Sequence, residues 1–160
     1  MDVQIALDGP AGTLLVSGTG LPVVELVRAA GTPADEHTPI GTRKAALLTL
    51  TVDGAPAVVR PSRGRLLRRS YRVDVHTGGL RYRLVPCSHG ESRLSRDGRR
   101  IGTLSSSGDG RVTDEWDAGP GTVPTPLDLA VGTALAAAFG TGAAPWWETL
   151  GDIVAELIAP

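Results

Sequence analysis

The apolar run at residues 126–139 constrains the fold of this chain more than any other feature. It reads Pro-Leu-Asp-Leu-Ala-Val-Gly-Thr-Ala-Leu-Ala-Ala-Ala-Phe, and apart from Asp128 and Thr133 it has no polar face. A helix that is apolar on all sides has to be buried on all sides. At about 1.5 Å per residue the run extends about 20 Å, which is too short to span a bilayer. The run therefore predicts a helix enclosed by the rest of the chain.

Short strands separated by turn residues fill the chain before this helix. In residues 71–76 and 80–84 apolar and polar side chains alternate, and Thr77-Gly78-Gly79 between them is typical of a hairpin turn. The same pattern predicts further strands at residues 3–7, 13–17, 45–52, 57–60, 93–96, 99–104 and 111–116. Successive short strands at regular spacing favour a mainly β fold, an antiparallel meander closing into a barrel around the hydrophobic C-terminal helix.

A single domain over residues 1–160 accounts for the whole chain. Its predicted parts are a β-rich meander (1–117), a linker (118–126), the buried helix (127–139) and a terminal amphipathic helix (146–158). Residues 21–30 read equally well as a strand or a helix, and residues 31–41 as a polar loop. The terminal helix places Trp146 and Leu150 on an apolar side and Glu148 on the other. That apolar side either packs on the barrel or forms the seam of a homodimer.

Composition points to the cytoplasm. Cys87 is the single cysteine, so no internal disulfide can form. The segment beginning Met1-Asp2 carries an acid where a signal peptide has a basic region, and we expect no leader and no transmembrane segment.

The net charge of −1 conceals a strong segregation. Residues 60–111 hold thirteen arginines and four acids, a balance of +9, and the rest of the chain holds three cations and thirteen acids, a balance of −10. Either the basic part forms an anion-binding surface, or acidic and basic segments neutralise each other in the fold. The arginines predicted to bind an anionic ligand are Arg68, Arg69, Arg72, Arg81 and Arg83. Planar guanidinium groups in such a row suit phosphate or carboxylate partners.

Nucleic acid is not expected as a partner. In the register that turns the arginines outward, Tyr71 and Tyr82 face the core, so they offer no platform for stacking bases.

Other chemistry has little support in the sequence. The chain has neither a phosphate-binding Gly-rich loop nor a Gly-x-Ser-x-Gly turn, and we predict no catalytic residues, no metal site and no cofactor. His76, Cys87 and His89 are the residues that a small enzyme would use, since Cys87 and His89 share one face of an extended segment.

The carboxylates around Trp116 form a second candidate of this kind. Asp117 is expected beside Glu115, and Asp114 with Trp116 on the other face. A carboxylate pair for acid–base work needs surroundings that push the two pKa values apart, and the alternative is a solvated strand end.

The order of elements resembles a known family. The hairpin Tyr71-Arg-Val-Asp-Val-His76 and Leu80-Arg-Tyr-Arg-Leu84, the strand Gly98-Arg-Arg-Ile-Gly-Thr103 and the helix start Pro126-Leu-Asp-Leu-Ala-Val131 resemble the tubby-like fold of the phospholipid-scramblase and LURP-one-related proteins. The resemblance covers residues 45–140 and implies a closed antiparallel barrel around a hydrophobic C-terminal helix. In tubby, basic residues on the barrel bind phosphoinositide head groups. This chain has no cysteine-rich stretch and no calcium-loop acid pattern, so the resemblance implies the fold more than an activity.

Three functions follow from these observations. The first is a non-enzymatic cytoplasmic binding module whose arginine-rich face takes a lipid head group, a phosphorylated ligand or an acidic protein. The second is an assembly protein that forms a homodimer through residues 146–158. The third is a small enzyme that uses His76, Cys87 and His89.

Overall fold

The computed structural model describes residues 2–62, 71–88, 90–117, 119 and 123–141. Within these residues, ten strands precede one α-helix. The elements are β1 (Val3–Asp8), β2 (Thr13–Gly18), β3 (Val24–Arg28), a short 3₁₀ helix η1 (Ala45–Leu47), β4 (Leu48–Val52), β5 (Ala55–Pro61), β6 (Val73–Thr77), β7 (Leu80–Ser88), β8 (Glu91–Arg96), β9 (Arg99–Ser106), β10 (Val112–Trp116) and α1 (Pro126–Phe139).

The sheet is an antiparallel meander in which each strand pairs with the next one along the chain, from β1 to β10. Among the turns whose residues are all described, those of β4–β5, β6–β7 and β8–β9 have two residues each. Asp97-Gly98 is an example. Asp97 has φ 50° and Gly98 φ 82°. Positive φ at both central positions matches the right-handed twist of the strands, and Asp-Gly is a preferred pair there. The predicted mainly β meander is therefore confirmed.

The two end strands of the sheet are β1 and β10. No ladder joins them within the described part of the chain, so the sheet curls without forming a paired barrel seam. The ends approach at one point, where a Cβ added to Gly110 would lie 3.6 Å from the Cβ of Leu7. The strand pairing therefore does not confirm the predicted closure of the sheet into a barrel.

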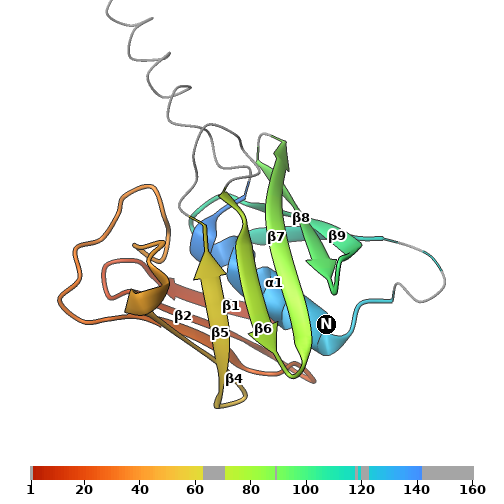
Figure 1. The fold of residues 1–160 in the computed structure, drawn as a ribbon, viewed down its shortest axis with the longest axis horizontal. Helices are drawn as coiled ribbons and strands as arrows, with labels where there is room; N and C mark the ends of the chain where they lie inside the picture. The colour runs from red at the N-terminus through yellow and green to blue at the C-terminus, as the bar shows by residue number, and fades with distance from the viewer. Residues whose placement is uncertain (1, 63–70, 89, 118, 120–122, 142–160) are drawn as a thin grey trace, which may run out of the picture.

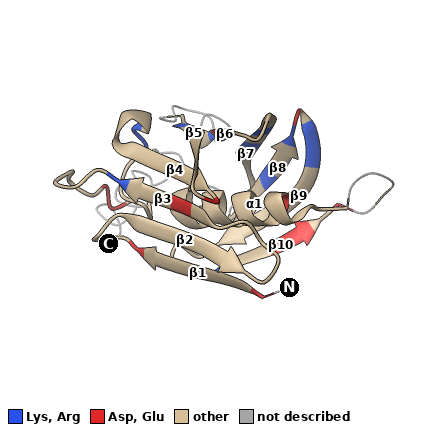
Figure 2. Cartoon of the chain, turned by 90° about the horizontal axis from the view of Figure 1, so that it is seen from below, with Lys and Arg blue, Asp and Glu red and all other residues tan. Residues whose placement is uncertain are grey.

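Helix α1 lies inside the curl of the sheet, with strands on several of its sides (Figures 1 and 2). It begins as the sequence predicts, with Pro126 in its first turn and Thr125 as the N-cap. From Ala130 to Phe139 every residue is buried, and the helix contacts β1–β3 as well as β7–β10. A Cβ added to Gly132 would lie 2.7 Å from Cδ2 of Leu94, so the absence of a side chain lets the helix pack closely on β8.

A buried polar cluster fixes the start of α1, and the sequence did not predict it. The carboxylate of Asp128 is fully buried, accepts a 2.6 Å hydrogen bond from the hydroxyl of Tyr82 and pairs with Arg96 of β8. It also accepts from the backbone N–H of Thr125 at 2.9 Å, which completes a capping box. The helix is thereby tied to β7 and β8 by polar contacts as well as by apolar packing.

The N-terminal half of the chain has its own polar anchor, Arg28 at the end of β3. This side chain is only 6% exposed, and its guanidinium donates to the carbonyl groups of Gly9, Pro10 and Ile40. It holds the β1–β2 turn against the loop before η1.

Two local assignments are settled by the coordinates. The ambiguous residues 21–30 contain strand β3, because Val24 and Leu26 point into the core in alternation. The predicted strand at 45–52 opens instead with η1, and β4 begins at Leu48. The predicted terminal helix at 146–158, with its alternatives of barrel packing or a dimer seam, lies outside the described residues. No helix in the described ranges is long and apolar enough to cross a membrane.

Candidate functional site: an arginine face with a cleft

Among the described residues, six arginines project from the outer surface of β5–β9, and we call this surface the arginine face. Residues opposite each other in an antiparallel ladder share a face, so one row of side chains can be followed from strand to strand. One such row crosses four strands. It runs from Arg60 of β5 to Asp74 of β6, then to Arg83 of β7 and Ser95 of β8. The arginines of the face are Arg60, Arg72, Arg81, Arg83, Arg93 and Arg100, and all six are exposed. Figure 2 shows the resulting basic segments on β7–β9.

Three of the five predicted ligand-binding arginines come together on this face. Arg81 and Arg83 alternate with buried Tyr82 on β7, and Arg72 precedes buried Val73 at the start of β6. Arg68 and Arg69 lie outside the described residues.

Sequence reasoning missed the other three arginines of the face. Arg60 and Arg93 alternate with the buried residues Val59 and Leu94, so strand alternation would have placed both of them outward. Arg100 would have been harder to place, because the register shifts between Leu94 and Ser95 where β8 pairs with β9.

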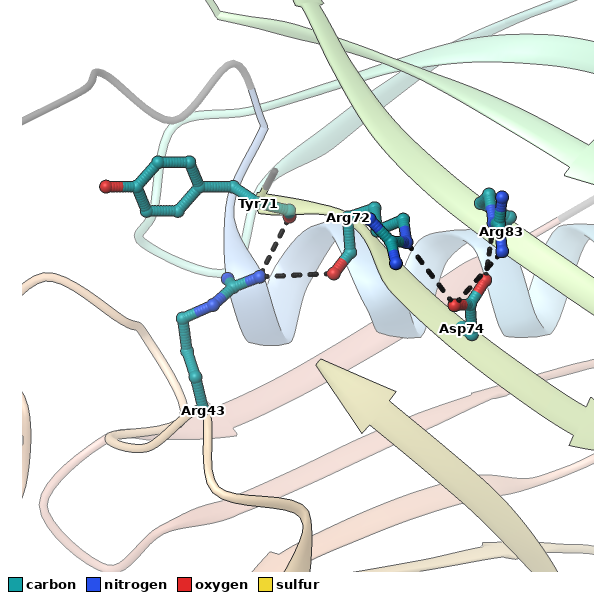
Figure 3. A network of polar contacts seen from close by, with 5 residues as sticks. All are labelled: Arg43, Tyr71, Arg72, Asp74 and Arg83. Atoms are coloured by element: carbon teal, nitrogen blue, oxygen red, sulfur yellow. Dashed lines mark hydrogen bonds and ion pairs between the residues drawn. The ribbon is translucent and has the colours of Figure 1, made fainter. Parts of the chain in front are cut away.

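Asp74 neutralises part of this face (Figure 3). Its carboxylate accepts two hydrogen bonds from Arg83, from Nε at 2.7 Å and from Nη2 at 3.4 Å, and pairs with Arg72 at 3.8 Å. The hydrogen bonds and the attraction to Asp74 raise the pKa of Arg83. Because Arg83 is 47% exposed, this pair is worth little to stability but fixes the direction of the guanidinium.

Arg43 supports the same edge from the loop before η1. Its Nε donates to the carbonyl of Ser62 at 2.7 Å and its Nη2 to the carbonyl of Tyr71 at 2.8 Å, so it joins the end of β5 to the approach to β6 (Figure 3). The guanidinium also lies 5.6 Å from the ring of Phe139 at the end of α1. Burial lowers the pKa of Arg43 to about 10, which reflects the cost of taking its charge out of water. Arg43 therefore belongs to the scaffold, although it is a cation close to the face.

An open cleft of about 840 Å³ occupies one end of the arginine face. Its cationic wall is formed by Arg81 and Arg83, and His76 lies opposite Arg81 in the ladder. Its other wall is apolar and is formed by Pro56, Ala57 and Val58 of β5. Gly78 and Gly79 of the β6–β7 turn and Asp97 and Gly98 of the β8–β9 turn also line the cleft, so it holds one carboxylate beside its two guanidinium groups.

The two arginines of the cleft differ in their pairing. The guanidinium of Arg83 is held by Asp74, whereas that of Arg81 has no acceptor among the residues that the structure describes. Asp97 binds only the backbone of Arg81, at 2.9 Å. The cleft thus presents one oriented and one available guanidinium, a combination that suits an anion with several oxygen atoms.

The residues that a small enzyme would use do not come together within the described part of the chain. His76 is opposite Arg81 near the start of β7, and Cys87 lies near its end, six residues further, which corresponds to about 20 Å along a strand. That separation prevents a direct nucleophile–base pair. His89 lies outside the described residues. No group of three metal-ligating side chains occurs within the described ranges.

Two of the carboxylates near Trp116, Asp114 and Asp117, contact neighbouring side chains. Asp114 accepts a hydrogen bond from Nε1 of Trp116 at 3.0 Å, and Asp117 pairs with Arg100 at 3.4 Å. The second pair shows that acidic and basic segments do neutralise each other at the β9–β10 edge of the arginine face.

Comparison of the chain with protein-family models, with curated proteins and with solved structures finds no match in any of the three. The functional reading therefore depends on the geometry and charge of the arginine face.

Proposed function

We propose that this protein is a non-enzymatic binding module that takes a phosphate-bearing ligand in the cleft of the arginine face. The observation that carries the proposal is the guanidinium of Arg81, which lacks an acceptor among the described residues and lines the cleft beside Arg83. Arginine donates two parallel hydrogen bonds to a phosphate, which gives both affinity and orientation.

The size of the cleft favours a small ligand over an acidic protein. Ligand pockets commonly measure about 300–1,000 Å³, and a volume of about 840 Å³ falls in that range. A stable protein partner would need about 800 Å² on each side, which is a broad and flat contact. Across the arginine face, Asp74, Glu91, Asp97 and Asp117 reduce the charge of six arginines to +2. Asp97 lines the cleft itself, so binding there depends on the hydrogen-bond donors of Arg81 more than on net charge.

The tubby-like fold is part of this proposal. It is supported by the order of ten antiparallel strands followed by a buried helix, and by the approach of Leu7 to Gly110 at the two ends of the sheet. Closure of these ends would give the barrel of that family. A cytoplasmic location remains a prediction from the sequence.

Calorimetric titration with inorganic phosphate tests the proposal, at about 0.01 M and about 0.15 M ionic strength. We expect binding that weakens at the higher ionic strength, because the arginines are exposed. Arg81→Gln should weaken binding about tenfold or more, since a hydrogen bond to a charged group is worth about 1.5–3 kcal/mol. Asp74→Asn should tighten binding, because it frees Arg83 from its internal carboxylate.

Arg111→Gln is the matched control. Arg111 is 87% exposed, lies in the β9–β10 turn away from the cleft, and its loss changes the net charge by the same amount. Equal weakening by Arg81→Gln and Arg111→Gln would mean diffuse attraction and would contradict a defined site. Binding to anionic vesicles or to an acidic protein without binding of phosphate would also overturn the proposal.

A further inference from the structure

An open, mainly apolar slot lies next to the cleft, where β4 and β5 separate. The two strands pair only from Leu50 to Val52, opposite Ala55 to Ala57. Beyond Ala57, β5 turns away to pair with β6, so the two strands separate. The separation leaves a slot of about 430 Å³.

The slot is lined mainly by small or apolar side chains. Ala45 and Ala46 of η1 and Leu48 of β4 form one side, and Val58 of β5 lies on the other. Of the described residues that line it, Arg60 alone is charged. A polar ligand gains no partner from the alanine, leucine and valine side chains, whereas a hydrocarbon chain loses contact with water there.

The cleft and the slot share one wall. Pro56, Ala57 and Val58 line both of them. The side chain of Val58 is 44% exposed, a large value for a valine. In the sheet Val58 pairs with His76, and His76 pairs in turn with Arg81. Two strand spacings of about 4.8 Å separate the backbone of Val58 from that of Arg81, a distance of about 10 Å. An anion held by Arg81 therefore lies within reach of an apolar surface that continues into the slot.

We infer that the ligand is a single anionic amphiphile, with a phosphate in the cleft and a hydrocarbon chain along Val58 into the slot. This inference rests on the proposed function and names the class of ligand that the same site takes. A free molecule fits better than a bilayer, because Val58 is the one large apolar side chain of the described slot lining that is exposed, whereas a membrane anchor presents a broad apolar face.

A series of n-alkyl phosphates tests the inference, from inorganic phosphate through butyl, hexyl and octyl phosphate, each below its micelle concentration. We expect calorimetry to show affinity rising roughly twofold to fourfold for each added methylene group until the slot is filled. Octanol, which has the chain without the phosphate, should bind far more weakly than octyl phosphate.

Variants of the slot separate the chain from the phosphate. Val58→Ser and Ala46→Gln should both reduce the gain per methylene group. Ala46 lines the slot but not the cleft, so Ala46→Gln should also leave the affinity for inorganic phosphate within about twofold. Val23→Ser is the matched control, because Val23 is also 41% exposed but precedes β3, away from the residues that line the slot. It should leave the chain-length dependence unchanged.

The outcomes separate this inference from the proposed function. Equal affinity for octyl phosphate and inorganic phosphate would overturn the inference and leave the phosphate site intact. Binding of no member of the series would contradict the proposed function itself. Octanol binding as tightly as octyl phosphate, or binding to vesicles of a phosphate-bearing lipid without binding of monomeric octyl phosphate, would also overturn the single-amphiphile inference.

Discussion

Replacing Asp128 tests how the helix is held inside the sheet. The carboxylate is fully buried and serves three donors at once, the hydroxyl of Tyr82, the guanidinium of Arg96 and the backbone N–H of Thr125. Asp128→Ala removes all three acceptor contacts and leaves no group in their place.

The expected loss of stability can be worked out contact by contact. Tyr82 is fully buried, so its unsatisfied hydroxyl costs about 1–3 kcal/mol. Loss of the capping interactions costs about 1 kcal/mol more. Breaking a buried ion pair costs about 3–5 kcal/mol, but the side chain of Arg96 is 22% exposed and can turn toward water, so we expect a contribution below that range. With about 1–2 kcal/mol for the contact of Arg96, the total for Asp128→Ala is about 3–6 kcal/mol, and Asp128→Asn, which keeps an acceptor, should lose about half of this.

Urea unfolding followed by circular dichroism measures the free energy of unfolding of each variant. Asp2→Ala, at an exposed position, is the control and should change stability by less than about 0.5 kcal/mol. Adding Tyr82→Phe to Asp128→Ala should recover part of the loss, because it removes the donor that has no acceptor. A loss below about 1 kcal/mol for Asp128→Ala would refute the reasoning.

The pH dependence of the same stability follows from Asp128. Burial raises its pKa, but the hydrogen bonds from Tyr82, Thr125 and Arg96 outweigh burial, so its folded pKa lies below the ordinary value. The folded protein thus binds this proton more weakly than the unfolded chain does. The ionised Asp128 carboxylate contributes its full stabilisation above the pKa of the unfolded chain, about 3.9. This contribution is lost as the pH falls through the folded pKa. The stability difference between the wild type and Asp128→Asn should accordingly shrink below about pH 4, and a difference that grows there would contradict the assignment.

Three further substitutions test the packing of the scaffold by thermal or urea unfolding. Gly132→Ala should destabilise by about 1–2 kcal/mol, because its Cβ would lie 2.7 Å from Leu94, although alanine favours an isolated helix; stabilisation would show that the core yields there. Arg28→Met should cost about 2–4 kcal/mol, since three carbonyl groups lose their donor, and an unchanged midpoint would argue against this anchor. Arg43→Lys should cost about 1–2 kcal/mol, because one ammonium group cannot span the carbonyls of Ser62 and Tyr71, and full retention of stability would contradict the role given to the guanidinium.

Local sequence patterns predict most of the strands and the helix of this protein. The alternation around buried Val73 and Val75 and the two-residue turns fix the strand faces and the hairpin registers, because a slip of one residue would expose the core face. The apolar run at 126–139 predicts a buried helix because no exposed face is available to it.

Contacts between distant segments could not be predicted in the same way. Arg28 and Arg43 read as ordinary surface cations in the sequence, and only the folded loops supply the carbonyl groups that they bind. The partnership of Asp128 with Tyr82 joins residues 46 positions apart, so no local pattern reports it. The cleft could not be predicted for the same reason. Strand alternation places Arg81 outward, but the wall formed by Val58 depends on the pairing of β5 with β6.

The position of the bound anion is the central claim, and backbone amide NMR during titration with inorganic phosphate tests it most directly. We expect the largest chemical-shift changes at Gly78, Gly79 and Gly98, which line the cleft, and at the side-chain Nε–H of Arg81. These changes should saturate as the phosphate concentration rises. Shift changes centred on Arg111 or on β1–β3, or no change at all, would contradict the claim.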